Sequence, residues 1–454
     1  MHRILKNYRS MNYRFKKTYS CVLALIIILG ITNSCSTTKV VVDPKDLSYI
    51  YNPANNPINP LFNVFNESES QSVFSIKIFN SELYFSEANP LGTPTAMLSI
   101  SLKLYNLDQG RIITDTAELN LDIKKEEGKQ EYVFDINLNA QSGYNYLAEV
   151  IIIDKVRQKM IQSFVPFNKL NDYNRFNFIA KGYFLQNRLF SSILRKDEFA
   201  NLVYPKKKID SLYISFYQPF KEIPYPPSML LPEKIMSEEP DRIVAVQYSD
   251  TMPIMFPRKG IFFCTIGRDV PDGYTFFDFG PDFPKMTTPE SMMEPLAYIS
   301  NDAEMGSLKN SPNSKVALDE FWIARGVNIE KARELIRIYY NRVAYANFYF
   351  TSFKEGWRTD RGMIYIIYGT PDKIYKADDG ERWGYRKPVI KTTWGTRYHI
   401  TEGYAYFSFT KKTNKFSDNE FTLNRGENSI TYWDQAVRSW RNGIVFRLDN
   451  PTDI

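Results

Sequence analysis

The chain has 454 residues, which is too long for one compact domain and predicts about three. Hydrophobic residues make up 43 % and charged residues 24 % of the sequence, so we expect neither wholesale disorder nor a polytopic membrane protein. Only two histidines, His2 and His399, and three cysteines, Cys21, Cys35 and Cys264, are present. Most zinc sites and histidine-dependent catalytic triads cannot be built from so few side chains.

The net charge of +6 comes from the N-terminal segment. Residues 1–34 contain six basic residues and no acidic one. Removing those six from the 57 basic residues leaves 51, which equals the number of acidic residues. A neutral mature chain has no electrostatic basis for binding nucleic acid.

Residues 1–34 have the pattern of an export signal. A basic region precedes an apolar run from Cys21 to Ile31, and this run is shorter than the about 20 residues of a membrane-spanning helix. The sequence ITNSC, which ends at Cys35, resembles a lipoprotein signal, in which the cysteine is lipidated and becomes the first mature residue. We therefore expect a lipid attached at Cys35, which would anchor the chain to a membrane.

The residues after Cys35 bear on the destination. Ser36 is not the aspartate that resembles an inner-membrane retention signal, and no acidic cluster follows. We expect an outer-membrane lipoprotein that faces the periplasm, with an ordinary signal peptide and a chance cysteine as the alternative. Once Cys21 has left with the signal and Cys35 is lipidated, only Cys264 remains, so no intramolecular disulfide is expected.

Three segments follow the signal before the C-terminal part of the chain. Residues 35–72 are predicted to be the lipidated cysteine and a tether, because prolines alternate with asparagines there. Residues 73–168 repeat period-two alternation, which predicts an antiparallel β-sandwich of immunoglobulin-like type. Residues 169–305 predict a second β-rich domain with long proline-rich loops, in which Cys264 lies in an apolar strand as a buried, inert thiol.

The composition changes near residue 305, because all six tryptophans lie beyond it. Helical spacing predicts a helix over 328–350, with Asn328 as its N-cap and Gly356 as its stop. We expect a short strand over 363–368, a hairpin that turns at Asp379-Gly380, a strand over 404–409 and a helix over 431–441. Residues 306–454 are therefore predicted to be an α+β domain. The expected fold is multidomain and mainly β, with two antiparallel β-sandwich domains before this domain.

The C-terminal domain resembles the GWxTD-domain family. The segment GWRTDRG at 356–362 carries the name motif. Further pieces fit in order at 321–322, 340–347, 364–371, 381–383, 421–425 and 436–441. The resemblance implies an exported, often lipid-anchored protein of Gram-negative bacteria, and it implies no particular enzymatic activity or ligand.

The motif segment is the candidate site, and it has two interpretations. Its residues and their expected neighbours are Trp357, Thr359, Asp360, Arg361, Glu381 and Trp383. In the structural interpretation Gly356 ends a helix in the left-handed conformation and Trp357 fills the gap between helix and sheet. Thr359 and Asp360 then bind backbone donors, and Arg361 pairs with Asp360 or Glu381. In the functional interpretation Trp357, Asp360 and Arg361 form the rim of a binding groove.

Other chemistry has weaker signals. Asp378, Asp379 and Glu381 do not have EF-hand spacing, so a solvated hairpin tip is favoured over a Ca²⁺ site. His399 has no evident partner, and we expect an ordinary strand histidine. No P-loop, GxGxxG, CxxC or GxSxG pattern occurs, so we expect no nucleotide, cofactor or metal. The tryptophans are interpreted as core residues, partner contacts or sugar-stacking platforms.

These observations favour a non-enzymatic accessory lipoprotein of the cell envelope. We expect it to act as a docking or scaffold subunit of an outer-membrane-associated protein complex, whose members the sequence does not identify. The alternative is an envelope hydrolase or a glycan-binding protein, for example for peptidoglycan, that uses the carboxylates and tryptophans of the C-terminal domain. An enzyme requires acids that converge in a cleft, whereas a scaffold requires only exposed apolar or aromatic patches.

Overall fold

The computed structural model describes residues 47–53, 56–86, 92–194, 198–232, 234–377, 379–387, 390–394, 397–401, 403–426 and 432–449. The predicted signal peptide, the predicted lipidation site Cys35 and the first part of the predicted tether lie outside these residues. Within the described ranges, no helix is both long enough and apolar enough to cross a membrane. The chain is mainly β, with several antiparallel sheets, and most of its helices lie in the C-terminal region.

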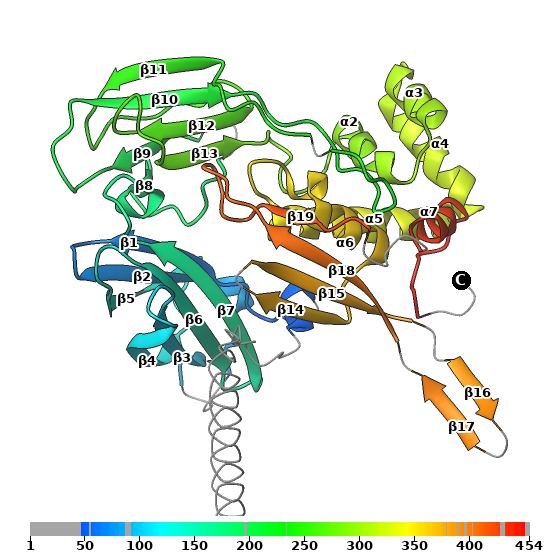
Figure 1. Ribbon diagram of the computed structural model, residues 1–454, viewed down its shortest axis with the longest axis horizontal. Helices are drawn as coiled ribbons and strands as arrows, with labels where there is room; N and C mark the ends of the chain where they lie inside the picture. Colours follow the sequence, from blue (N-terminus) through cyan, green and yellow to red (C-terminus); the bar gives the residue numbers. More distant parts are fainter. Residues whose placement is uncertain are drawn as a thin grey trace, which may run out of the picture. The chain divides into compact units, whose positions relative to one another are not determined.

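The first domain is the predicted β-sandwich (Figure 1). Its two antiparallel sheets have the strand orders β1-β2-β5 and β4-β3-β6-β7. The strands are β1 (Leu61–Asn66), β2 (Gln71–Phe79), β3 (Thr95–Asn106), β4 (Ile112–Lys124), β5 (Glu131–Asn139), β6 (Asn145–Asp154) and β7 (Lys159–Asn168). The alternation in the sequence produces this packing, since Leu98, Ile100, Leu102 and Leu104 of β3 are all at most 1 % exposed.

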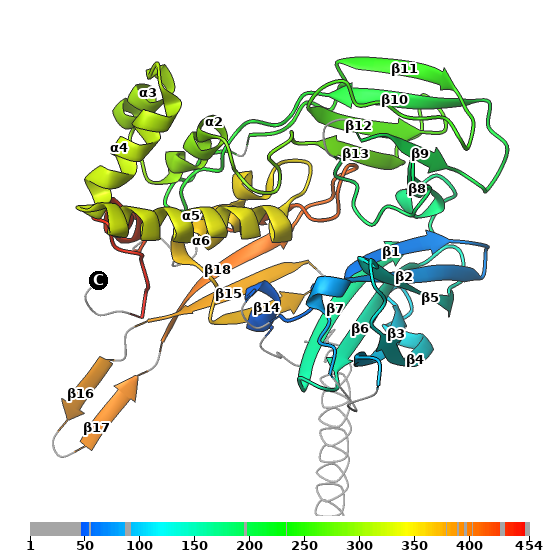
Figure 2. The same cartoon turned by 180° about the vertical axis from the view of Figure 1, so that it is seen from behind.

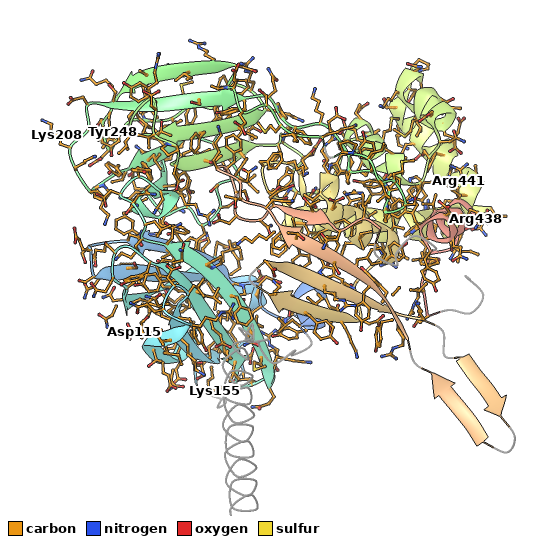
Figure 3. The ribbon with its side chains drawn as sticks, viewed as in Figure 1. Asp115, Lys155, Lys208, Tyr248, Arg438 and Arg441 are labelled. Carbon is orange, nitrogen blue, oxygen red and sulfur yellow. The ribbon has the colours of Figure 1, made fainter. Side chains whose placement is uncertain are left out.

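A side chain also ties the two sheets together at one edge. Asp115 of β4, labelled in Figure 3, accepts a hydrogen bond of 2.7 Å from the backbone N–H of Asn139 in β5. Strands β4 and β5 belong to different sheets, so this bond closes the sandwich beside the hydrophobic core.

The tether prediction for 35–72 is wrong where residues are described. Strand β1 pairs with β2 over its whole length, from Leu61 to Asn66. The 3-10 helix η1 (Ser48–Tyr51) places Leu47 and Tyr51 in the core of the C-terminal domain. Prolines favour extended chain but do not prevent an edge strand from starting just after them, and Pro60 directly precedes β1.

The second β-rich region contains a four-stranded antiparallel sheet and a two-stranded one. The larger sheet has the order β11-β10-β12-β13, and β8 pairs with β9. The strands are β8 (Ile179–Gly182), β9 (Ala200–Val203), β10 (Ser211–Tyr217), β11 (Arg242–Gln247), β12 (Gly260–Thr265) and β13 (Tyr274–Asp278). These strands agree with the β-rich region predicted over 169–305, and β12 contains the apolar strand predicted around Cys264.

Strand β12 is buried on both faces. Phe262 and Cys264 pack into one hydrophobic cluster, while Ile261 and Phe263 pack into another with Phe416 of the C-terminal domain. A strand covered on both faces has a continuous run of apolar residues, and this explains the apolar sequence of β12. Cys264 is 0 % exposed, and burial raises the pKa of its thiol, which confirms the prediction of a buried thiol.

The C-terminal domain combines helices with a four-stranded sheet, whose order is β14-β15-β18-β19. The helices are α2 (Pro289–Met293), η4 (Glu294–Tyr298), α3 (Asp302–Asn310), α4 (Ser314–Gly326), α5 (Ile329–Phe350), η5 (Gly356–Arg358), α6 (Asp360–Tyr368) and α7 (Trp433–Arg441). The strands are β14 (Lys373–Ala377), β15 (Gly380–Arg386), β18 (Tyr404–Lys411) and β19 (Phe421–Leu423), with the hairpin β16 (Ile390–Trp394) and β17 (Arg397–Thr401) inserted between β15 and β18.

Helices α5 and α6 lie against one face of this sheet (Figure 2). Asn328 caps α5 as predicted, accepting from the N–H of Lys331. The helical part begins at Pro289, and Leu296 and Ile299 join its core, so the boundary expected at 305 lies too late. Helix α7 is fixed to α3 through Arg441, labelled in Figure 3, which pairs with Glu304 at 2.6 Å.

The strand predicted over 363–368 is wrong, because this segment belongs to helix α6. All nine residues from Asp360 to Tyr368 are buried. A short apolar run without an exposed face has no visible period, so the sequence does not distinguish a buried strand from a buried helix. The motif therefore lies at a corner between two helices.

Candidate functional site

The corner at 356–361 joins α5 to α6 at very close range. A Cβ on Gly356 would lie 2.0 Å from the backbone oxygen of Ala346, and a Cβ on Gly362 would lie 1.9 Å from the oxygen of Gly356. Gly356 does not have a positive φ, so the left-handed helix stop predicted for it is wrong. Glycine is required because the backbones touch.

Trp357 is a core residue. Its side chain is 0 % exposed, and its ring packs edge-on against Tyr298 with centroids 6.2 Å apart. The backbone is held from two sides, since its N–H donates to Asn347 Oδ1 and its oxygen accepts from the Tyr298 hydroxyl. This burial confirms the structural interpretation of Trp357 and excludes it from the rim of a groove.

Thr359 is the N-cap of α6. Its Oγ1 accepts from the N–H of Gly362 at 3.0 Å and donates to the oxygen of Gly356 at 2.7 Å. Both bonds close the corner on itself. They satisfy backbone groups that the start of a helix leaves without partners, as the turn chemistry predicted.

Asp360 does not pair with its neighbour in sequence. Its Oδ1 accepts from the guanidinium of Arg425 at 2.5 Å, and its Oδ2 accepts from the N–H of Leu423 at 2.9 Å. Both charged side chains are 9 % exposed. A buried carboxylate with a cation and a backbone donor is fully engaged, so this residue fastens α6 to the end of β19.

Arg361 pairs with Glu381, the second of the two partners that the sequence suggested. The Nη1–Oε1 distance is 3.3 Å, and the two side chains are 2 % and 4 % exposed. The same guanidinium donates to the backbone oxygen of Asn419 and lies 3.8 Å from the ring centre of Phe421. It thus connects α6 to β15 and to the segment before β19.

Glu381 is the centre of a buried polar cluster. Its carboxylate accepts from the Tyr51 hydroxyl at 2.8 Å and from Trp383 Nε1 at 3.0 Å. Lys376 Nζ lies 3.2 Å from Oε1. We name Tyr51, Arg361, Lys376, Glu381 and Trp383 the Glu381 cluster. Its members come from η1, α6, β14 and β15.

The electrostatics of this cluster keep Glu381 ionised. Burial raises the pKa of the Glu381 carboxyl, but the Lys376 ammonium and the Arg361 guanidinium outweigh burial and lower the pKa to about 2. Burial, together with the Glu381 charge, raises the pKa of Tyr51, so its hydroxyl stays protonated and donates. The Glu381 carboxylate thus has two cationic partners and two hydrogen-bond donors inside the fold, so we interpret the cluster as one that holds the structure together.

A cavity of about 440 Å³ lies next to the corner. Its lining includes Glu222, Lys234, Phe353, Asp360, Lys412 and Arg425. Of the three residues expected at a groove rim, Asp360 alone lines this cavity, whereas Trp357 and Arg361 are not part of its wall. The cavity therefore meets the motif through the Asp360–Arg425 pair.

The remaining candidate residues are the acidic residues at 378–381 and His399. Asp379 is exposed at the hairpin between β14 and β15, whereas Glu381 is buried. The predicted solvated hairpin tip therefore does not include Glu381. Asp378 lies outside the described residues. His399 lies in β17 opposite Thr392. In the described part of the chain, no group of three or more His, Cys, Asp or Glu side chains is arranged to hold a metal.

Five of the six tryptophans are described with their side chains, and all five are core residues. Trp322, Trp357, Trp383, Trp433 and Trp440 are at most 5 % exposed. A sugar-stacking platform requires an exposed ring face, so these five side chains do not provide one.

Sequence reasoning missed three residues of the site. Tyr51 was assigned to the tether, and Lys376 and Arg425 have no local pattern that marks them as partners of Glu381 and Asp360. The one signal in the sequence was the resemblance at 421–425, which placed Arg425 in a segment that accompanies the motif. Pairs between distant segments leave no periodicity to detect.

The comparisons with known proteins agree with the resemblance over part of the chain. Residues 260–442 match the family model described as the GWxTD domain. The match begins with β12 and ends one residue after α7. No curated protein matches the chain.

Solved structures give only distant similarity. Bacteroides uniformis beta-glucuronidase 2, bound covalently to cyclophellitol-6-carboxylate aziridine, is 16 % identical over 24 % of this chain and 13 % of its own, with a TM-score of 0.17. A calcium-binding mutant of that enzyme is 14 % identical over 38 % of this chain and 17 % of its own, with a TM-score of 0.19. The chain thus spans less than a fifth of these proteins, and such scores carry no argument about function.

Proposed function

Since the chain carries a GWxTD domain over residues 260–442, we propose that it is a non-enzymatic accessory lipoprotein of the cell envelope. It acts as a docking or scaffold subunit of a protein complex at the outer membrane. Cys35 carries the lipid, and the β-sandwich, the second β-rich region and the GWxTD domain form the part that meets the partner on the periplasmic side.

One observation supports a scaffold role most strongly. Both charged residues of the motif are used inside the fold, because Asp360 pairs with Arg425 and Arg361 pairs with Glu381. All four side chains are at most 9 % exposed. Acid–base catalysis needs a carboxyl group that reaches substrate and changes its protonation near the working pH, whereas these groups brace three segments of the domain. We therefore infer that the motif residues stabilise the fold of the domain, and that the surface of the domain contacts the partner.

The hydrolase or glycan-binding alternative receives no support from the same residues. It relied on the carboxylates and tryptophans of this domain. The Glu381 carboxyl has a pKa of about 2 and is enclosed, and the five described tryptophan rings are buried. A glycan would have to bind through other groups.

The anchor is tested by replacing Cys35 with Ala. Wild-type chain should pellet with membranes and carry acyl mass on its N-terminal peptide, whereas Cys35→Ala should appear in the soluble periplasmic fraction. Cys264→Ser is the matched control, since it removes the buried thiol and should leave the chain in the membrane fraction. A Cys35→Ala chain that still pellets, together with wild type free of acyl mass, would contradict the lipoprotein assignment.

The docking role is tested in detergent-solubilised envelopes. A tagged full-length chain should recover a partner in fixed stoichiometry, and the tagged partner should recover this chain in return. A chain that migrates alone in both directions, and that cleaves purified peptidoglycan, would replace this proposal with the alternative. Lysozyme digestion before capture distinguishes a protein contact from co-retention on glycan.

A further inference from the structure

The segment between β10 and β11 is fastened to the GWxTD domain. We name residues 221–240 the strap, of which residue 233 lies outside the described ranges. Arg358 Nη1 donates to the backbone oxygen of Lys221 at 2.5 Å, and Arg425 Nη2 donates to the oxygen of Tyr225 at 2.7 Å. Near the other end of the strap, Lys415 Nζ donates to the oxygen of Glu238 at 3.3 Å. Both ends of the strap are therefore held in place.

The middle of the strap exposes apolar side chains. Met229 is 46 %, Leu230 73 %, Leu231 49 % and Ile235 86 % exposed. Clustered apolar side chains in contact with water give the folded chain no stability, and such patches mark sites that another molecule covers. Here the patch lies on a segment whose two ends are hydrogen-bonded to the GWxTD domain.

The strap also forms one wall of the 440 Å³ cavity. Ile235 and Met236 line it from the strap, and Phe416 lines it from the GWxTD domain. Volumes of this size accommodate a few side chains of a bound segment. Ile235 thus belongs both to the exposed apolar side chains of the strap and to the wall of the cavity.

The charges along the cavity have a positive surplus. The wall carries five cations and four carboxylates, a surplus of one positive charge. Three of the carboxylates are paired with cations of the wall, because Glu222 pairs with Lys234, Glu420 with Lys354 and Asp360 with Arg425. The fourth, Glu238, forms no ion pair among the described residues. Lys412 is exposed and has no carboxylate within ion-pair distance among the described residues. Lys415 donates to the Tyr217 hydroxyl and to a backbone oxygen, and neither acceptor is charged.

We propose that the strap and this cavity form a docking site for an extended segment of a partner protein that carries apolar side chains next to a carboxylate. The apolar side chains cover Leu230 and Ile235, and the carboxylate binds at Lys412 and Lys415. Charge complementarity at this edge selects an acidic segment over a basic one. The inference rests on the proposed docking function and names the site and the chemistry of the partner.

The test places a photo-crosslinking amino acid at position 235 of the full chain in intact envelopes, and at position 185 as the control. Leu185 is 82 % exposed and lies in the turn between β8 and β9. Position 235 should give an adduct at least tenfold stronger than position 185. Sequencing the adduct by mass spectrometry should identify a segment of another protein that contains Asp or Glu beside apolar residues.

Charge variants complete the test. Lys412→Glu should lower the adduct at position 235 at least tenfold, and Lys412→Arg should preserve it. Lys208→Glu, at an exposed lysine between β9 and β10 labelled in Figure 3, makes the same charge change elsewhere and should have no effect. Thermal melting of each variant shows that the fold is retained, since Lys412 is exposed.

The outcomes separate the docking site from the function. An adduct with a second copy of this chain, with lipid or with glycan, an adduct segment without carboxylates, or insensitivity to Lys412→Glu would overturn the docking site. If reciprocal capture still recovers a partner in that case, the docking function stands and the site is wrong. If neither capture nor crosslinking yields a partner, both are wrong.

Discussion

The hydroxyl of Tyr51 donates to both carboxylate oxygens of Glu381, at 2.8 and 3.1 Å, across 330 positions of the sequence. The backbone oxygen of Tyr51 in turn accepts from the hydroxyl of Tyr365 in α6. The segment directly after the predicted anchor region thus completes the polar core of the GWxTD domain. A chain that begins at residue 260, where the family match starts, would lack this side chain.

Removing the Tyr51 hydroxyl should destabilise the protein. We expect Tyr51→Phe to lower the free energy of unfolding by about 1.5–3 kcal/mol, because a hydrogen bond to a charged group is lost from a buried site. Chemical denaturation of the full chain measures this. Tyr84→Phe is the control, since Tyr84 is 50 % exposed, and it should change stability by less than about 0.5 kcal/mol. Equal effects of the two variants would contradict the role of the Tyr51–Glu381 contact.

Gly356→Ala should disrupt the contact between α5 and α6. Its new Cβ would lie 2.0 Å from the oxygen of Ala346, so the backbones must separate, and overpacking of this kind costs about 1–3 kcal/mol or more. Gly306→Ala in α3 is the matched substitution, because nothing lies within 4 Å of its Cβ position. In that helix alanine should stabilise by about 0.5–1 kcal/mol. Melting temperatures that shift in opposite directions are the expected result.

The Asp360–Arg425 pair should behave as a buried pair. Asp360→Ala leaves a guanidinium that is 9 % exposed without its partner, and we expect a loss of about 3–5 kcal/mol. The double variant Asp360→Ala/Arg425→Ala should cost at least about 1 kcal/mol less than the sum of the two single variants.

A surface pair provides the contrast. Lys315 and Asp319 form an i,i+4 pair with side chains 72 % and 46 % exposed, so Asp319→Ala should cost less than about 1 kcal/mol. Strict additivity of the Asp360 and Arg425 variants would show that these two side chains are not coupled.

Glu381 should make the protein sensitive to acid. Its pKa falls from 4.5 in the unfolded chain to about 2 in the folded one. The unfolded state therefore binds the proton first as the pH falls, and stability present above pH 4.5 is lost between about 4.5 and 2. The shift corresponds to about 3 kcal/mol.

The measurement is the free energy of unfolding as a function of pH for wild type and Glu381→Gln. The glutamine variant should be less stable at pH 7 because Arg361 and Lys376 lose their counter-charge. It should also have a flatter pH profile below 4.5. Parallel profiles for the two proteins would refute the assignment of this acid-sensitive step to Glu381.

The sequence by itself determined the features that depend on neighbours along the chain. The alternation of Leu98, Ile100, Leu102 and Leu104 was sufficient to predict a half-buried strand, because a strand places every second side chain on one face. Asn328 was sufficient to predict where α5 begins, because a cap acts on donors within the next turn. The ordered pieces around GWRTDRG identified the GWxTD domain for the same reason, since each piece is a short contiguous sequence motif and the motifs occur in a fixed order.

Only the tertiary structure decided what these pieces do. Helix α6 is buried on all sides, so its apolar run has no period from which a helix could be distinguished from a strand. Which acidic side chain pairs with which basic one depended on their distance in space. Asp360 pairs with Arg425 and not with the adjacent Arg361, because a buried charge needs a partner that the fold brings into contact with it. Tyr51 showed no local sign of its role, because burial against Glu381 becomes visible only after residues 330 positions apart have been brought together.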